Sequence, residues 1–400
     1  FEDTEENPSR LELIPDQCFY NNENLTAIEI PRSVKVIGDM AFTPGWGGGG
    51  LDEIILHEGL EEIGDMAFAS DSGEGPFITE LSIPSTVKSI GTNAFANATN
   101  LTSIVFERNE DGECAIEVIG ATAFMRAAIT TVTLPKTLAG SAYVTNEDTG
   151  EVVPDGMLAL GLFAECALLT TVIFEDGCPL ITSYGDYVFM GCTSYADITF
   201  PVNLQAIGEW GEGGAIKSIT ILNFFDEETF MNFVPSLSGV VSFTMEPNNP
   251  YLYQDTWTEN GETCYGAVYN ADKTRLLYYP NCYTNESYTV LKGTLEIADR
   301  AFYENSYLKE ILLPEGLEVI GDYAFGVAAD AHTTALESIE IPSTVASIGE
   351  YAFYGAGKLQ TVTFRKTDGS CALTTIGSSA FRLCTSLEEI AIPDSVSTLG

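Results

Sequence analysis

Histidine and the short motifs of catalytic and metal sites are scarce in this sequence, and each shortage excludes a class of function. Only His57 and His332 occur in 400 residues, and no H-E-x-x-H, C-x-x-C or G-x-S-x-G string is present. With so little histidine, a Ser-His-Asp or Cys-His arrangement is hard to build. No spacing of ligands suits a metal, and no Gly-rich loop carries the residues that cradle a phosphate. The sequence therefore predicts no catalytic residue, no cofactor and no metal site.

Long apolar runs are also missing. A membrane helix needs about 18 or more apolar residues in a row, and the best segment, 157–169, is shorter and contains Glu165. We therefore expect no direct insertion into a membrane. No signal segment is visible either, because the chain opens with the acidic stretch 1–10, which we expect to be a mobile leader.

Positive charge is scarce as well. The chain has 17 Lys and Arg against 58 Asp and Glu, a formal net charge of −41. Nucleic acid and anionic lipid would be repelled by such a surface, so neither is expected as a partner. One interpretation of the charge is that it keeps an exported protein soluble. Another is that it attracts cationic partners or divalent ions. The two interpretations are compatible. Segments 109–112 and 146–148 are either ordinary turns or calcium loops, although they lack EF-hand spacing.

A repeated string occupies most of the chain. Residues 25–42 follow the template L-x-x-I-x-I-P-x-x-V-x-x-I-G-x-x-A-F, and related strings end at Phe95, Phe325 and Phe353. The Phe of the A-F step returns after 23 residues from Phe302 to Phe325 and after 28 from Phe325 to Phe353. A unit this short cannot bury its own apolar side chains. It must stack on copies of itself, so the repeat predicts a solenoid.

Each unit contains two short extended pieces. The alternating L-x-x-I-x-I predicts a strand, and the Pro that often follows it cannot donate a ladder hydrogen bond and ends it. V-x-x-I-G predicts a second extended piece closed by a Gly turn at positive φ, and the A-F step predicts a tight or helical turn. We expect about fourteen first strands, paired in parallel, starting near Ile28, Ile54, Leu81, Ile104, Val132, Val172, Ile198, Ile219, Val241, Tyr288, Ile311, Ile339, Val362 and Ile390.

The repeats predict one continuous solenoid with three stretches. Regular repeats occupy 11–222 and 298–400, and 223–297 holds degenerate coils with a Tyr-rich hairpin insert. Within that insert, 265–269 and 275–279 are the predicted hairpin strands. Residues 139–155 resemble a hairpin flap, and 226–234 a short helix with Asp226 as N-cap.

The chain resembles the BspA-like branch of the leucine-rich repeats, found in surface proteins of bacteria and some parasitic protists. The string I-P-x-x-V-x-x-I-G-x-x-A-F carries the resemblance, which covers nearly the whole chain and is weak between about 208 and 297. It implies a right-handed leucine-rich-repeat solenoid, mainly β with short turns. It also implies an extracellular or cell-surface location and a binding or adhesion role without enzymatic activity.

Nine cysteines, an odd number, fall mostly at repeat positions. Cys18 replaces the Ala of the A-F step, and Cys166, Cys192 and Cys384 lie three residues after its Phe. This register predicts small buried apolar side chains. One pair, Cys264 and Cys282, flanks the predicted hairpin and is a candidate disulfide.

Two surfaces are candidates for binding. The first is the Tyr-rich insert, whose rings either pack the hairpin onto the solenoid or form a ledge for glycan or protein. Its candidates are Tyr251, Tyr253, Trp257, Tyr278 and Tyr279. The second is the outer face of the first strands, which suggests weak multivalent contact. Its candidates are Glu53, Glu80, Thr131, Thr133 and Thr171.

Three functions remain open at this stage. The first is a secreted or surface-anchored binding protein, monomeric, with protein or glycan partners on host or neighbouring cells. The second is a structural spacer that presents another domain. The third is an enzyme, for which a carboxylate pair suited to glycoside hydrolysis is conceivable but is not singled out by any residue.

Overall fold

The structure is a computed structural model, and it divides the chain into two compact units, 1–216 and 217–400. It describes residues 9–44, 50–69, 76–146, 149–198, 200–208, 217–221, 225–237, 240, 242–245, 248–259, 261–327 and 334–400. Most of the predicted leader, 1–8, and His332 lie outside these residues. The predicted three-stretch organisation of the repeats stays a prediction.

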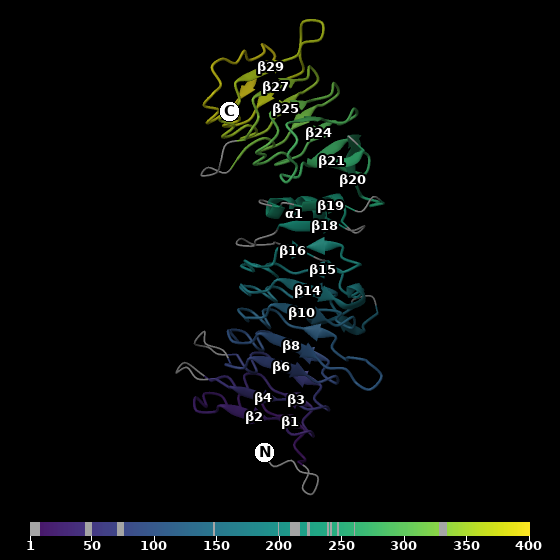
Figure 1. Cartoon of the computed structure of the whole chain (residues 1–400), viewed down its shortest axis with the longest axis vertical. Helices are drawn as coiled ribbons and strands as arrows, with labels where there is room; N and C mark the ends of the chain where they lie inside the picture. The colour runs from purple at the N-terminus through teal and green to yellow at the C-terminus, as the bar shows by residue number, and fades with distance from the viewer. Residues whose placement is uncertain are drawn as a thin grey trace. The chain divides into compact units, whose positions relative to one another are not determined.

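Unit 1 is a stack of coils, each with two short strands (Figure 1). The first strands pair in parallel as β2–β4, β6–β8 and β10–β14. The second strands form one parallel sheet, β1-β3-β5-β7-β9, and then β13-β15-β17. The register places Ile14, Ile37, Ile63, Ile90 and Ile119 in one buried row. The first strands are β2 (Ala27–Glu29), β4 (Glu53–Ile55), β6 (Glu80–Ile83), β8 (Ser103–Phe106), β10 (Thr131–Leu134), β14 (Thr171–Phe174) and β16 (Asp197–Ile198). The second strands are β1 (Leu13–Ile14), β3 (Val36–Ile37), β5 (Glu62–Ile63), β7 (Ser89–Ile90), β9 (Val118–Ile119), β13 (Met157–Leu158), β15 (Ser183–Tyr184) and β17 (Ala206–Ile207).

Unit 2 repeats this plan. Its first strands pair in parallel as β18–β19 and as β23-β25-β27-β29, and its second strands as β22-β24-β26-β28-β30-β31. The first strands are β18 (Ser218–Ile221), β19 (Ser242–Met245), β23 (Ser287–Thr289), β25 (Glu310–Leu312), β27 (Ser338–Ile341) and β29 (Thr361–Phe364). The second strands are β22 (Arg275–Tyr278), β24 (Glu296–Ile297), β26 (Val319–Ile320), β28 (Ser347–Ile348), β30 (Thr375–Ile376) and β31 (Thr398–Leu399). The predicted strand near Ile390 is wrong, because 388–392 form no strand.

Aromatic rings of the A-F steps form a stacked row within the core of each unit. In unit 1 the rings stack from Phe19 to Phe189, with centroids 5.1–6.2 Å apart and planes within 13° of parallel. In unit 2 the row runs from Tyr279 through Phe302 to Phe381 at 5.0–5.5 Å. Because each ring covers the faces of its neighbours, every coil is stabilised by the coils beside it. The predicted solenoid is confirmed.

The Gly of the I-G step serves close packing and not a positive φ, which corrects the sequence prediction. A Cβ on Gly91 would lie 2.5 Å from the backbone nitrogen of Asp65 in the preceding coil. The left-handed residue is instead the one before Ala, such as Met66 at φ 53°. The Asp65 carboxylate then accepts the backbone N–H of Thr92, at 2.7 Å, and Asp39 does the same for Asp65, at 2.8 Å. The A-F step is thus a tight turn without helix.

Three inserts interrupt the coils. In unit 1, β11 (Tyr143–Thr145) and β12 (Val152–Pro154) pair antiparallel and form the predicted flap, and a short 3-10 turn, η1 (Glu175–Gly177), follows β14. In unit 2, α1 (Glu227–Phe233) begins as predicted, with Asp226 accepting the N–H of Thr229 at 2.8 Å, and the 3-10 turn η2 (Val234–Leu237) follows it.

The Tyr-rich insert of unit 2 is a three-stranded antiparallel meander. β20 (Leu252–Glu259), β21 (Glu262–Asn270) and β22 pair in that order. The predicted hairpin is β21–β22, and the sequence analysis missed β20. Within the described part of the chain there is a single α-helix, and it has seven residues. No helix in that part is long and apolar enough to span a bilayer.

Candidate functional site

Two of the predicted binding residues in the Tyr-rich insert are part of the core, and their assignment is wrong. Tyr279 is fully buried and stacks on Phe302 at 5.5 Å, so it occupies the position that Phe holds in other coils. Tyr278 is 3% exposed and packs against Phe230 and Phe243. Neither ring can reach a ligand, because the coils on which they pack cover them.

The other three aromatic candidates reach the surface to different degrees. Tyr251 is 49% exposed. Tyr253 is half-buried, with the Lys273 ammonium 3.6 Å from its ring centroid. Trp257, also half-buried, lies on β20 with its ring centroid 6.4 Å from that of Tyr288. Trp257 lines a hollow.

The hollow at Trp257 has a volume of 570 Å³ and is formed where β20 meets the start of β23. The ring of Trp257 can approach Tyr288 because Gly266 lies beneath both, where a Cβ would be 2.7 Å from the Tyr288 ring. The remaining lining is polar, with three carboxylates, one amide and two hydroxyls from Asp255, Glu259, Glu286, Asn285, Ser287 and Thr289. We call this surface the Trp257 pocket.

Tyr288 anchors the floor of the Trp257 pocket. Its hydroxyl donates to Asp255 Oδ2 at 3.0 Å, lies 3.0 Å from the Tyr269 hydroxyl and accepts the N–H of Ala267 at 3.3 Å. Burial raises the pKa of Tyr288 far above its usual value, so the hydroxyl remains a donor. This bond orients Asp255 beside the indole. The pocket therefore offers one aromatic surface, one oriented carboxylate at Asp255 and further polar side chains that can accept hydrogen bonds from a polar ligand.

The strand-face candidates are exposed as predicted, but they do not converge on one site. Thr131 on β10 lies beside Thr171 on β14, and Thr133 lies beside Ile173. Glu53 and Glu80 lie on β4 and β6, farther along the stack. Exposed apolar residues share this face, and the sequence analysis gave them no role: Ile55, Val105 and Ile173, which are 37%, 51% and 46% exposed. Whether this face binds a partner stays a prediction.

All nine cysteines are free thiols, so the candidate disulfide between Cys264 and Cys282 is not formed. Val268 pairs with Tyr278, and four more steps of this antiparallel register would bring Cys264 opposite Cys282. β22 ends at Tyr278, however, and Pro280 follows, which cannot continue the ladder.

The remaining thiols mostly follow the predicted buried register. Cys166 and Cys192 are buried, and each donates its S–H to the carbonyl of the Phe one coil earlier, at 3.2 and 3.1 Å. Cys384 is only half-buried, and Cys18 is exposed in a turn that no earlier described coil covers.

This burial predicts how the thiols react. Burial raises the pKa of Cys178 and of Cys192 to about 12, so both stay protonated and unreactive at pH 8. We expect iodoacetamide at pH 8 to modify Cys18 in the native protein and to reach Cys166, Cys178 and Cys192 only after denaturation, as read by peptide mass spectrometry. Modification of the buried thiols at the rate of Cys18 would contradict this packing.

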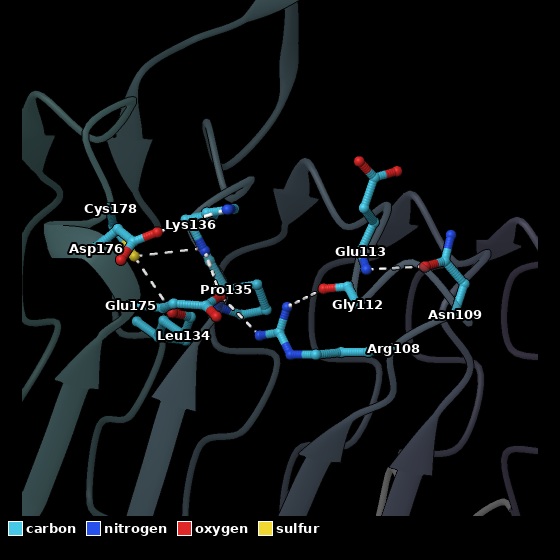
Figure 2. A network of polar contacts seen from close by, with 10 residues as sticks. All are labelled: Arg108, Asn109, Gly112, Glu113, Leu134, Pro135, Lys136, Glu175, Asp176 and Cys178. Atoms are coloured by element: carbon cyan, nitrogen blue, oxygen red, sulfur yellow. Dashed lines mark hydrogen bonds and ion pairs between the residues drawn. The ribbon is translucent and has the colours of Figure 1, made fainter.

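A second candidate surface, which the sequence analysis did not identify, lies in unit 1 beside the loop 108–113. Arg108 reaches past the β10 coil and donates to Glu175 Oε2 at 2.7 Å and to the Gly112 carbonyl at 3.2 Å (Figure 2). Glu175 also accepts the N–H of Lys136 at 3.1 Å. Asn109 Oδ1 accepts the N–H of Glu113 at 2.8 Å, so this predicted calcium-or-turn segment uses its amide to close a turn.

The bond from Arg108 to Glu175 holds the loop 108–113 against the coil of β14. Burial alone would raise the pKa of the Glu175 carboxyl, but the backbone N–H of Lys136 and the guanidinium of Arg108 outweigh it and lower that pKa. The loop therefore forms a fixed wall beside two adjoining hollows of 660 and 720 Å³. Nowhere in the described ranges do three or more His, Cys, Asp or Glu side chains gather as a metal-binding set.

Comparison with known proteins identifies the family of the chain. The model for the BspA type leucine rich repeat region matches in six copies, over residues 8–143, 158–236 and 277–400. A leucine-rich repeat protein from Bacteroides ovatus is similar in structure, with a TM-score of 0.51 and 20% identity over 97% of this chain and 86% of that chain. A leucine-rich repeat protein from Eubacterium ventriosum has a TM-score of 0.45 and 19% identity over 80% of each chain.

A leucine rich cell surface protein from Faecalibacterium prausnitzii has a TM-score of 0.36 and 18% identity, over 86% of this chain and 89% of that chain. No functionally curated protein matches the chain. The family match covers far more than half of the residues. The chain belongs to the BspA type leucine-rich repeat family.

Proposed function

We propose that this chain is a secreted or cell-surface bacterial binding protein that works without catalysis and contacts glycan or protein on a host or neighbouring cell. Membership of the BspA type repeat family supports a surface location. The formal charge of −41 supports a soluble exported protein. The observation that carries the binding role is the Trp257 pocket, where a half-buried indole lies beside the oriented Asp255 carboxylate.

The Trp257 pocket favours a glycan among these ligands. A pyranose presents an apolar C–H face that packs on an aromatic ring, and hydroxyls that donate to carboxylate and amide oxygens. Asp255, Glu286 and Asn285 supply such acceptors around the ring. Glu286 is also paired with Lys309 at 2.6 Å, which holds its carboxylate at the edge of the pocket. The net negative charge of the lining disfavours sulfated or phosphorylated sugars.

Replacing Trp257 by Ala is expected to weaken binding to the cognate glycan at least tenfold, because the indole supplies the apolar contact of the pocket. A glycan array identifies the ligand with the wild-type chain, and titration calorimetry gives the affinities. Tyr307→Ala is the matched control, since Tyr307 is 43% exposed in the same unit and does not line the pocket. Trp257→Phe should restore part of the affinity. Equal affinity of the wild type and Trp257→Ala would reject this site.

A structural spacer is the second candidate, and the dispersal of the strand-face residues over β4, β6, β10 and β14 favours it. A spacer needs no convergent site on its strands. It predicts no saturable ligand for the wild-type chain on arrays of glycans and extracellular-matrix proteins, whereas the binding function predicts at least one.

A further inference from the structure

The two hollows of unit 1 adjoin and form one groove. They share Lys88, Cys114 and Ala115. The first extends to Glu58 and the second to Leu180. The lining residues belong to five successive coils, those of β5, β7, β9, β13 and β15. At about 4.8 Å per coil, four steps span about 19 Å, the length of about six residues of extended chain. We call this surface the flap groove.

Two parts of the flap groove are held in place. The Arg108–Glu175 bond holds the loop 108–113 (Figure 2). Glu110 and Glu113 of this loop line the groove. The base of the flap also lines the groove, and the flap is tied down where the Tyr143 hydroxyl donates to Glu117 Oε2 at 2.8 Å. A groove whose walls are already positioned loses little conformational entropy when a ligand binds.

The floor and rim of the groove differ in chemistry. Small and apolar side chains form the floor at Ala115, Ala139, Pro154 and Leu180, and Leu180 is 51% exposed. The rim is acidic, with six carboxylates against two basic side chains: Glu58, Glu61, Glu110, Glu113, Glu117 and Asp155 against Lys88 and Arg108.

Both basic side chains are already paired. Lys88 lies 2.6 Å from Glu61, and Arg108 lies 2.7 Å from Glu175. An anionic ligand would therefore meet carboxylates without a free cation to bind it. Glu117 and Asp155 already accept hydrogen bonds from Tyr143 and Ser141. A ligand with Lys or Arg side chains would meet Glu110 and Glu113 on the loop, and its charge complements the net negative charge of this rim.

We propose that the flap groove binds an extended segment of a partner protein in which Lys or Arg alternates with small apolar residues. The side chains of an extended chain point alternately to opposite sides. Small residues then contact the floor at Ala115 and Leu180 while the cationic residues reach the carboxylate rim. This site is separate from the Trp257 pocket and takes a different class of ligand.

A fluorescein-labelled (Lys-Ala)3 peptide tests this proposal on the full chain by fluorescence anisotropy. We expect saturable binding that weakens as salt rises, and no saturable binding of (Glu-Ala)3. Leu180→Lys and Glu113→Lys should each weaken binding at least tenfold. Both positions are exposed, and unchanged thermal unfolding confirms that each variant folds.

Matched controls separate the groove from the general negative charge. Leu168→Lys changes an apolar residue that is 53% exposed outside the groove, and Glu23→Lys changes an exposed carboxylate elsewhere in unit 1. Both should leave the affinity within twofold of wild type, as should Trp257→Ala, which separates this proposal from the glycan site. Absence of saturable binding, equal binding of (Glu-Ala)3, or equal losses in the control variants would each overturn the proposal.

Discussion

Replacing Phe95 by Ala lowers the free energy of unfolding of unit 1 by about 3–5 kcal/mol, the cost of removing a fully buried aromatic side chain. Phe95 is 0% exposed, and its ring lies between Phe68 at 5.2 Å and Phe124 at 5.9 Å. The cavity cannot close easily, because the backbone of each coil is hydrogen-bonded to the next, as Phe95 N–H is to the Ala123 carbonyl at 2.9 Å. Urea unfolding followed by circular dichroism measures the change.

Phe77→Ala is the matched control for this experiment. Phe77 is 36% exposed and takes no part in the row of stacked rings. Its replacement should cost less than about 1 kcal/mol, as expected for a surface position. Similar losses for the two variants would mean that the stacked rings do not determine the stability of the coils.

Replacing Gly91 by Ala is expected to cost about 3 kcal/mol or more, at the upper end of the overpacking range. The added methyl group would lie 2.5 Å from the backbone nitrogen of Asp65 and 2.5 Å from the carbonyl carbon of Gly64. Backbone atoms cannot rotate away as a side chain can. Relief therefore requires separating β5 from β7, with loss of the hydrogen bond from Gly91 N–H to the Ile63 carbonyl.

Gly112→Ala provides the comparison for Gly91→Ala. Gly112 has φ +79° in the loop 108–113, and a Cβ there would meet nothing within 4 Å. The cost should be about 1–2 kcal/mol, from the left-handed backbone alone. A Gly91→Ala variant as stable as Gly112→Ala would show that the coils can separate at this point without loss. Thermal or urea unfolding of the two variants side by side measures the difference.

The repeat made most of the fold predictable. A 23-residue unit with fixed apolar positions has few ways to bury Phe42 or Phe95, so the stacking of coils and the direction of the strands follow from the spacing. The residue types of short segments predicted the N-cap at Asp226 and the antiparallel flap. The role of the repeated Gly was not predictable in this way. It depends on the distance between neighbouring coils, and the sequence of one unit does not give that distance.

The candidate sites were less predictable. In a coil that departs from the template, the sequence does not show whether a tyrosine lies on the surface or in the core. Tyr279 is buried because it completes the row that Phe302 continues. One signal could have identified this role: Tyr279 precedes Phe302 by 23 residues, the basic repeat length.

The flap groove depends on contacts over a long range of sequence. Arg108 and Glu175 are 67 residues apart and belong to coils that are not adjacent along the chain. The insertion that contains the flap lengthens the spacing between two repeat units, and the template does not specify by how much. Sequence spacing could therefore place the loop and the flap on the solenoid but not show that both line one groove.

Hydrogen–deuterium exchange of the Phe95→Ala variant, read by mass spectrometry under native conditions, tests most directly whether the coils depend on their neighbours. We expect faster exchange in the coils of β5 and β9, on either side of Phe95, and a smaller effect at β1 and β15, farther along the stack. Faster exchange confined to the coil of β7, or equal across all of unit 1, would contradict stabilisation by neighbouring coils.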